Sequence, residues 1–290
     1  MPTFHFSFLT AKEFPQLHEA FLKAFADYVI PIQLTKEQFR AKVIREGIEP
    51  SFCVAAYDGQ EIAGFILTGL GEWQGKPTAY NAGTGVLPQY RGQKLTQQMY
   101  DVLLPKLRAS GIEQCLLEVI QDNNAALRSY QAVGLHITRS LDCFRALKTE
   151  LLLPAHNDSD FIEVLPTEKA DLKLFRCFRD VTPTWQNSFA AIKRSREQCC
   201  ILEARNVSKE VVGYIAFFPK SGAIAQLAVD ELWRKKGVGT ALLREATRQV
   251  EAPAIMFINI ESTAQSMISF LTRRHMQLIL KQYEMLMAIA

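Results

Sequence analysis

Two short stretches of this sequence have the composition of a turn that leads into a helix and binds an anion. In the second half, the segment from Arg234 to Gly239 reads Arg-Lys-Lys-Gly-Val-Gly and follows a strand-like run that ends at Val229. Free backbone N–H groups at a helix start, together with the helix dipole, attract a negative charge. Glycine lets the backbone approach a bulky group such as pyrophosphate. The segment from Arg91 to Thr96 is the counterpart in the first half, so the sequence predicts two phosphate-type turns.

A carboxylate within an apolar strand is the second feature that could do chemistry. Glu118 lies in the run Cys-Leu-Leu-Glu-Val-Ile, which contains no other charged residue. Burial raises the pKa of a carboxyl group toward the range in which it acts as a base near neutral pH. A structural hydrogen bond at a strand edge is the alternative explanation. Glu118 is therefore a candidate general base, and a structural role remains open.

Strands and helices must position these residues, and hydrophobic periodicity predicts where they lie. In the first half we expect strands at 4–8, 51–57, 61–70, 78–86, 115–120 and 136–147, and helices at 11–26, 35–46, 92–110 and 124–133. In the second half we expect strands at 161–165, 199–204, 211–218, 223–229 and 254–259, and helices at 169–179, 237–250 and 265–274.

The order of these elements repeats once along the chain. Arg91 and Arg234 begin equivalent turn–helix segments, and Gly134 and His275 end equivalent helices, at nearly the same offset of about half the chain. The polar, proline-containing stretch 149–160 is the best linker. These patterns predict an N-terminal domain at 1–148 and a C-terminal domain at 161–290.

Two motifs resemble the GNAT superfamily of N-acetyltransferases. The segments 86–92 and 234–239 resemble the family's acetyl-CoA loop, (Gln/Arg)-x-x-Gly-x-(Gly/Ala). The segment 123–135 resembles the family's Asn-x-x-Ala-x-x-x-Tyr-x-x-x-Gly-Phe pattern. The resemblance covers nearly all of the first half and about residues 199–288. It implies an α/β fold of two tandem GNAT-like domains, each a mixed, mainly antiparallel sheet flanked by helices, with acetyl-CoA as co-substrate.

The resemblance also implies which residues bind and react. Tyr130 stands where the family has its general acid, although a core tyrosine would fit the same helix. Glu118 stands as in the ribosomal-protein N-terminal acetyltransferases, where such a glutamate is the base. The implied acetyl-CoA-binding residues of the first half are Val86, Arg91, Gly92, Gln93, Lys94, Leu95, Thr96, Asn123 and Tyr130. Those of the second half are Val229, Arg234, Lys235, Lys236, Gly237, Val238 and Gly239. Asn123 is equally suited to cap the helix that follows it.

The two copies differ at the chemical positions. Counted in one register, Tyr130 corresponds to Leu271 and Glu118 to Asn259. Lys94 stands in place of the first glycine of the loop. A plain helical backbone at this position would tolerate a lysine. We therefore expect acetyl transfer to a primary amine, by direct attack on the thioester, in the N-terminal domain. A catalytically silent acetyl-CoA-binding sensor or scaffold, and an enzyme active only in the C-terminal domain, are the alternatives.

Composition excludes several other classes of protein. Hydrophobic residues make up 48% and charged residues 22% of the 290 residues, which excludes a disordered or fibrous chain. A net charge of +3 predicts no nucleic-acid stripe, and no apolar run is long enough to predict a membrane span. The six cysteines form no C-x-x-C pair, so we expect buried, reduced thiols and no metal site in a cytoplasmic protein. The first ten residues lack the basic start of a signal peptide. The acceptor would be a small amine or a peptide N-terminus.

Overall fold

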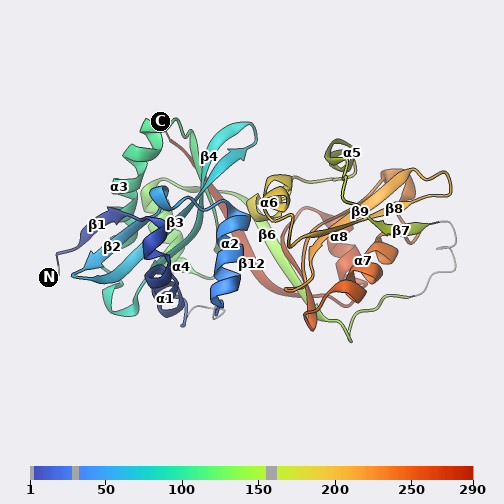
Figure 1. Ribbon diagram of the computed structural model, residues 1–290, viewed down its shortest axis with the longest axis horizontal. Coiled ribbons are helices and arrows are strands. Elements are labelled where there is room, and N and C mark those ends of the chain that lie inside the picture. Colours follow the sequence, from blue (N-terminus) through green and yellow to red (C-terminus); the bar gives the residue numbers. More distant parts are fainter. Residues whose placement is uncertain (1–2, 28–32, 155–161, 290) are drawn as a thin grey trace. The chain divides into compact units, whose positions relative to one another are not determined.

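The structure is a computed structural model that describes residues 3–27, 33–154 and 162–289. The chain divides into two compact units (Figure 1). Unit 1 comprises Met1–Arg139 and Tyr283–Ala290, and unit 2 comprises Ser140–Gln282. Within the described ranges, no helix combines the length and the apolar character that a membrane span requires.

Unit 1 is a sheet with helices on both faces. Its strands are β1 (His5–Phe8), β2 (Val54–Asp58), β3 (Glu61–Trp73), β4 (Lys76–Val86), β5 (Gln114–Ile120) and the part of β12 (Gln277–Ala288) that begins at Tyr283, in that spatial order. Its helices are α1 (Phe14–Ala24), α2 (Lys36–Glu46), α3 (Leu95–Ala109) and α4 (Asn124–Val133). Strands β1, β2, β3 and β4 pair antiparallel in succession, whereas β4 and β5 run parallel.

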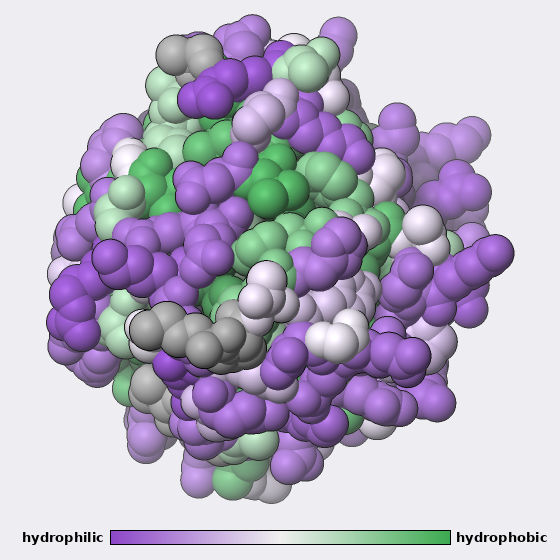
Figure 2. Space-filling model, turned by 90° about the vertical axis from the view of Figure 1, so that its left-hand side faces the viewer, coloured by the Kyte–Doolittle hydropathy of each residue, from purple (hydrophilic) through white to green (hydrophobic). Residues whose placement is uncertain are grey.

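Alternation along β3 assigns the helices of unit 1 to opposite faces of the sheet. Phe65 faces α1, where its ring stacks on that of Phe21 with centroids 6.1 Å apart. Ile66, the next residue, packs instead in a cluster with Met99 and Tyr100 of α3. Side chains of consecutive strand residues point to opposite faces, so both faces of the sheet bury apolar surface. Seen from the side that Figure 2 shows, hydrophilic side chains surround an area where apolar side chains reach the surface.

Unit 2 repeats this architecture. Its strands, in spatial order, are β6 (His136–Leu147, from Ser140 on), β11 (Ala254–Glu261), β10 (Ala223–Val229), β9 (Val211–Phe218), β8 (Cys200–Arg205) and β7 (Glu163–Pro166). Its helices are α5 (Leu172–Cys177), α6 (Phe189–Arg194), α7 (Val238–Gln249) and α8 (Gln265–Thr272). Helices α7 and α8 pack in one apolar cluster, and α5 and α6 in another.

In each unit the parallel strand pair separates after a few residues. Strand β4 pairs with β5 only over Thr78–Tyr80, and β10 pairs with β11 only at Ala223 and Ile224. The register on the other side of each strand also shifts, at Ala82 against β3 and at Ala225 against β9. A bulge of this kind bends its strand. Each unit therefore has a V-shaped opening whose wide end lies at the carboxyl ends of two parallel strands.

The units differ from the expected domains 1–148 and 161–290 because their last strands are exchanged. Strand β6 follows α4 in sequence, but from Ser140 it belongs to unit 2, where it pairs antiparallel with β11. Strand β12 follows α8, but from Tyr283 it belongs to unit 1, beside β5. No strand was expected at 277–288, and the apolar residues of β6 do not tell which sheet that strand completes. Of the expected linker 149–160, residues 155–160 lie outside the described residues.

Most expected elements are confirmed, and a few differ. The capping box that opens α2 is present, because the N–H of Gln38 donates to Thr35 Oγ1 and the N–H of Thr35 donates to Gln38 Oε1. Helix α3 begins at Leu95 rather than at residue 92, and the prediction omitted α6 and β12 altogether. The expectation of buried thiols holds for three of the six cysteines, whereas Cys177 is exposed on the short helix α5.

Candidate active site

The turn before α3 leaves backbone donors free in unit 1. Gly92 has a φ of 78° and Lys94, the N-cap residue, has a φ of 58°. No described side chain caps the helix, so the first-turn N–H groups keep their donor capacity. The expectation of a plain helical backbone at Lys94 is wrong. The residue takes a left-handed conformation, because the chain must turn sharply out of β4 before α3 can start.

The turn before α7 has the same geometry in unit 2. Gly237 is the N-cap residue with a φ of 83°, and no described side chain caps α7. Lys235 also has a positive φ, of 62°. Gly239 permits a close approach of α8, because a Cβ there would lie 3.3 Å from the ring of Phe270. Lys94 and Gly237 therefore occupy equivalent left-handed positions, one with a charged side chain and one without.

An arginine fixes each turn to its own unit. Arg91 donates from Nε to Val86 O (3.2 Å) and from Nη2 to Ala24 O (3.1 Å), and its guanidinium pairs with Asp27 at 2.7 Å. The guanidinium group of Arg91 thus acts as a clamp that ties the turn to β4 and to the end of α1.

The clamp of unit 2 repeats this pattern. Arg234 donates from Nε to Val229 O (3.0 Å) and from Nη2 to Phe178 O (3.1 Å), and it pairs with Asp180 at 2.9 Å. The side chains of Arg91 and Arg234 were expected to contact a ligand, but they bind other groups of their own unit. The backbone of each turn remains available to a ligand.

Glu118 lies on β5 with one buried carboxylate oxygen that has no partner. Tyr80 Oη, on the neighbouring strand β4, donates to Glu118 Oε2 at 2.5 Å. Glu118 Oε1 is buried and has no hydrogen-bond partner among the described residues. Strand β5 lies between β4 and β12, but its pairing with β4 ends at Leu116, so Glu118 lies where β5 has separated from β4.

The surroundings of Glu118 favour its neutral form. The pKa of Glu118 is raised to about 8, mainly by burial; the hydrogen bond from Tyr80 opposes the rise, the negative charges of Glu284 and Glu46 add to it, and Arg139 opposes it. Glu284 is itself held by Arg139, whose Nε donates to Oε1 at 2.9 Å and whose Nη2 donates to Oε2 at 2.7 Å. A group with a pKa near 8 can hold or release a proton at neutral pH.

Tyr130 is buried on α4, on the other side of β5 from Glu118. It packs in the cluster that contains Leu117 and Val119 of β5, whose side chains point away from that of Glu118 by strand alternation. Asn123 caps α4, because its Oδ1 accepts from the N–H of Ala126 at 3.1 Å. The structure thus puts the expected acid and base on opposite faces of the strand that borders the opening.

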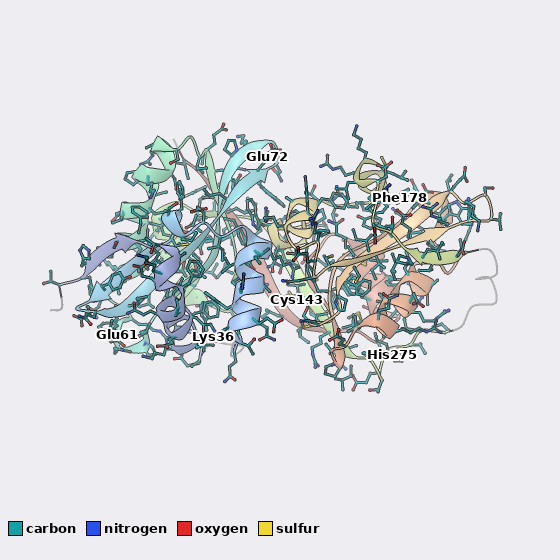
Figure 3. The ribbon with its side chains drawn as sticks, viewed as in Figure 1. Lys36, Glu61, Glu72, Cys143, Phe178 and His275 are labelled. Carbon is teal, nitrogen blue, oxygen red and sulfur yellow. The ribbon has the colours of Figure 1, made fainter. Side chains whose placement is uncertain are left out.

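A cavity of about 780 Å³ occupies the opening of unit 2. Five residues of the expected second-half set line it: Val229, Arg234, Lys235, Gly237 and Gly239. Lys236 lies instead over the ring of Trp233, 5.1 Å from the centroid, and Val238 is buried in the core. The cavity described in unit 1 measures about 320 Å³ and lies beside α1, lined by Gln16, Glu19 and Lys23 among others. Phe178, labelled in Figure 3, also lines the cavity of unit 2.

Basic side chains concentrate around the cavity of unit 2. They are Arg179, Arg234, Lys235, Arg273 and Arg274. Burial lowers the pKa of Arg179 and of Arg274, and the Nε atom of each is buried without a partner among the described residues. Desolvated cations of this kind favour an anionic ligand.

The structural register refines the correspondence between the two copies. Tyr80 pairs with Leu116, and its equivalent Ala223 pairs with Met256. On this register Glu118 corresponds to Ile258, not to Asn259 as counted in sequence. Strand β11 carries an extra residue between Phe257 and Ile260, where its register against β6 shifts. Asn259, with a φ of 61°, is part of this bulge and lines the cavity.

Comparisons with known proteins were consistent with this geometry. The sequence profile of the Acetyltransferase (GNAT) family matches residues 14–135 and again residues 163–276. The chain belongs to the GNAT acetyltransferase family. It is therefore an acyltransferase with two GNAT regions.

Similar structures cover the whole chain. A tandem GNAT protein from the clavulanic acid biosynthesis pathway is 14% identical with a TM-score of 0.71, and the match covers 99% of each chain. A GCN5-related N-acetyltransferase from Sphaerobacter thermophilus is 16% identical with a TM-score of 0.73, covering 99% of this chain and 96% of that one. At these identities the likeness shows the fold: a GNAT chain of tandem domains.

A curated relative is similar over part of the sequence. A mycothiol acetyltransferase from Nocardiopsis dassonvillei is 31% identical over 119 residues, which is 39% of this chain and 36% of that protein. The match thus spans about a third of the relative's length. GNAT acetyltransferases acetylate amines and generally use acetyl-CoA.

Sequence reasoning missed several residues that surround the two openings of this GNAT chain. They are Tyr80, Arg139, Glu284, Tyr214 and Gln226. Tyr80 lies within a strand that was expected, so its type could have marked it as a polar residue beside Glu118. Glu284 gave no such signal, because it reaches Arg139 only through the exchanged strand β12.

Proposed function

We propose that this protein transfers an acetyl group from acetyl-CoA to a primary amine, and that the transfer takes place in unit 1. The observation that carries the proposal is the environment of Glu118: a buried oxygen without a partner among the described residues, a pKa of about 8, and a position at the opening between β4 and β5. A carboxyl group at an opening whose pKa is perturbed by burial and by specific charged neighbours is a candidate for a functional site.

Each proposed step assigns a proton to a named atom. The free Oε1 of Glu118 takes a proton from the attacking ammonium, directly or through water. The amine nitrogen then bonds to the thioester carbonyl carbon, the bond from that carbon to sulfur breaks, and the second nitrogen proton passes to solvent, from which Tyr130 later regains its own. Tyr130 gives its hydroxyl proton to the leaving thiolate from the other face of β5. Proton transfers of this kind contribute about 10²–10⁴-fold each. Direct attack needs no acyl-enzyme.

The residues of both turns fit acetyl-CoA. Uncapped helix starts at Leu95 and Val238 offer backbone donors to a pyrophosphate. The pantetheine arm would enter between the separated strands of either unit. The cavity of unit 2, with its basic lining, specifically favours acetyl-CoA binding there as well. Because Ile258 and Leu271 replace the base and the acid, we propose that unit 2 binds acetyl-CoA without transferring its acetyl group.

A binding measurement tests the cofactor assignment first. Calorimetry with acetyl-CoA should show micromolar-range affinity, and a ligand at 100 times its dissociation constant should stabilise the fold by about 2.7 kcal/mol. No heat at millimolar acetyl-CoA would overturn the proposal. A panel of amines, assayed by release of the CoA thiol, then identifies the acceptor class among small amines and peptide N-termini.

A further inference from the structure

We propose that Asn259 recognises the acyl carbonyl oxygen of a thioester bound in unit 2, by donating a hydrogen bond from its side-chain Nδ2. This inference rests on the proposed binding of acetyl-CoA in the cavity of unit 2. It adds a ligand-recognising side chain that has no counterpart in unit 1, where Glu118 and Val119 occupy the corresponding stretch of strand.

Asn259 lines the cavity and has a buried donor with no partner among the described residues. The residue is 4% exposed and lines the cavity, and its Nδ2 is buried without a hydrogen-bond partner among the described residues. A buried amide N–H without a partner is costly, so native structures rarely keep one unless a water or a ligand takes the bond.

Its neighbours fix which end of the amide faces the cavity. Asn259 Oδ1 accepts from Gln282 Nε2 at 2.7 Å and from the thiol of Cys143, with a distance of 3.5 Å to Sγ. The thiol sulfur in turn accepts from the backbone N–H of Asn259 at 3.4 Å. A flipped amide would set its N–H groups against these donors. The network therefore holds Oδ1 on the side of β6, where Figure 3 labels Cys143, and leaves Nδ2 buried without a bond to these neighbours.

The backbone holds the side chain at the narrow end of the opening. Asn259 has a φ of 61° within the bulge of β11, a conformation that asparagine tolerates better than most residues. Asn187 Nδ2 donates to the carbonyl oxygen of Ile258 at 2.7 Å, which anchors the bulge from the loop before α6. Such a bulge redirects one side chain while the strand continues.

The ligand class follows from where this donor lies. Strands β10 and β11 separate just before Gln226 and Asn259, whereas the turn at Gly237 follows the wide end. A ligand held by its phosphates at the turn would extend its other end toward Asn259. Gln226 is already satisfied there, because its Oε1 accepts from Tyr214 and its Nε2 donates to Asn187 O. The matching group on the ligand is therefore an acceptor with no proton to give, and a thioester carbonyl oxygen meets this need.

A pair of ligands that differ only at the carbonyl tests the inference. Acetyl-CoA and S-ethyl-CoA have the same size, but the thioether lacks the oxygen. Calorimetry would use the full chain carrying Lys94→Asp, in which an acidic N-cap keeps phosphate from the turn of unit 1. We expect acetyl-CoA to bind about tenfold more tightly than S-ethyl-CoA, the effect of one hydrogen bond.

Two variants of Asn259 separate the hydrogen bond from the backbone. Asn259→Gly accepts the positive φ and should abolish the preference between the ligands. Asn259→Asp keeps the shape but turns an acceptor toward the carbonyl, so S-ethyl-CoA should become the tighter ligand. If Asn259→Gly still binds acetyl-CoA about tenfold more tightly than S-ethyl-CoA, this inference would be overturned, while the proposed site in unit 2 would stand. Absence of binding by both ligands would overturn the proposed site in unit 2 and this inference with it.

A spectroscopic measurement on the unmutated residue covers the case in which the variants do not fold. With asparagine labelled by ¹⁵N, acetyl-CoA should shift one side-chain amide pair that S-ethyl-CoA leaves in place. Shifts that are identical for the two ligands at every asparagine amide would contradict the proposal.

Discussion

Unit 1 and unit 2 share a framework but differ in what their openings contain. Both have a parallel strand pair that separates, a bulge beside it, an arginine clamp and an uncapped helix start. At the opening, unit 1 has the ionisable pair Tyr80 and Glu118, whereas unit 2 has Asn259 beside a cavity of about 780 Å³. The difference between the units supports the proposal that the arginine and the turn maintain a common binding framework, while a few side chains at the narrow end decide whether proton transfer is possible.

The substitution Tyr130→Phe should have the largest effect on turnover, because it changes the unit to which we assign the reaction. The change keeps the ring in the core and removes only the hydroxyl, so kcat should fall by about 10²–10⁴-fold while acetyl-CoA affinity changes little. Tyr57→Phe, on β2, is the matched control and should leave kcat near the wild-type value. Steady-state kinetics with the best amine measure both. If turnover is undiminished in Tyr130→Phe, the reaction would have to be assigned to unit 2 instead.

The next largest effect should be on the pH dependence of turnover, which should follow the ionisation of Glu118. With a pKa of about 8, the carboxylate is the active form of a base, so kcat/KM should rise about tenfold per pH unit below 8 and level off above it. Glu118→Gln should remove this limb, so its deficit should be greatest near pH 8 and shrink above that pH as bulk solvent deprotonates the amine. Glu113→Gln, an exposed change at the neighbouring position before β5, is the control. A rate loss that is independent of pH would favour a purely structural Glu118.

A matched pair of N-cap variants should divide cofactor binding between the units. Aspartate tolerates the left-handed conformation of Lys94 and Gly237, and its carboxylate repels phosphate from the free N–H groups. Each variant should lower acetyl-CoA affinity at its own turn by about tenfold or more, and Lys94→Asp should reduce turnover much more than Gly237→Asp.

Asparagine at the same two N-cap positions is the control for these variants, because it keeps the cap geometry without the charge. Stoichiometry by calorimetry and turnover by thiol release decide the outcome. Greater loss of turnover in Gly237→Asp would reverse the assignment of the two units.

The smallest of these effects should be that of the buried carboxyl group of Glu118 on thermal stability. The folded pKa of Glu118, about 8, lies above the value of 4.5 for a free glutamate, so the folded state holds this proton more tightly. Its stabilising contribution is present below pH 4.5 and is lost as the pH rises through 8. The Tm of the wild type should therefore fall relative to Glu118→Gln across this window, by about 2–4 °C per kcal/mol. Parallel Tm curves for the two proteins would contradict the shifted pKa.

Much of the architecture could be predicted because local signals were strong. The bounds of α4, β6, β9 and β10 match the expected ranges, since caps and turns at residues such as Asn123 and Gly134 define where these elements begin and end. Helix α6 was missed because it is only six residues long, too short to show a period. The exchange of β6 and β12 was missed because alternation tells which residues of a strand face the core and not which sheet it joins.

The sequence by itself determined the repeat, the two turns and the oddity of Glu118 in an apolar strand, because each depends on residue types within a short window. Only the tertiary structure decided that Tyr80 and Glu284 share the surroundings of Glu118, that Lys94 turns left-handed, and that a cavity of about 780 Å³ lies at the opening of unit 2. Those features arise where strands distant in sequence come together and a register shifts by one residue. A carboxyl group's pKa and an amide's free N–H depend on such neighbours, and no local pattern encodes them.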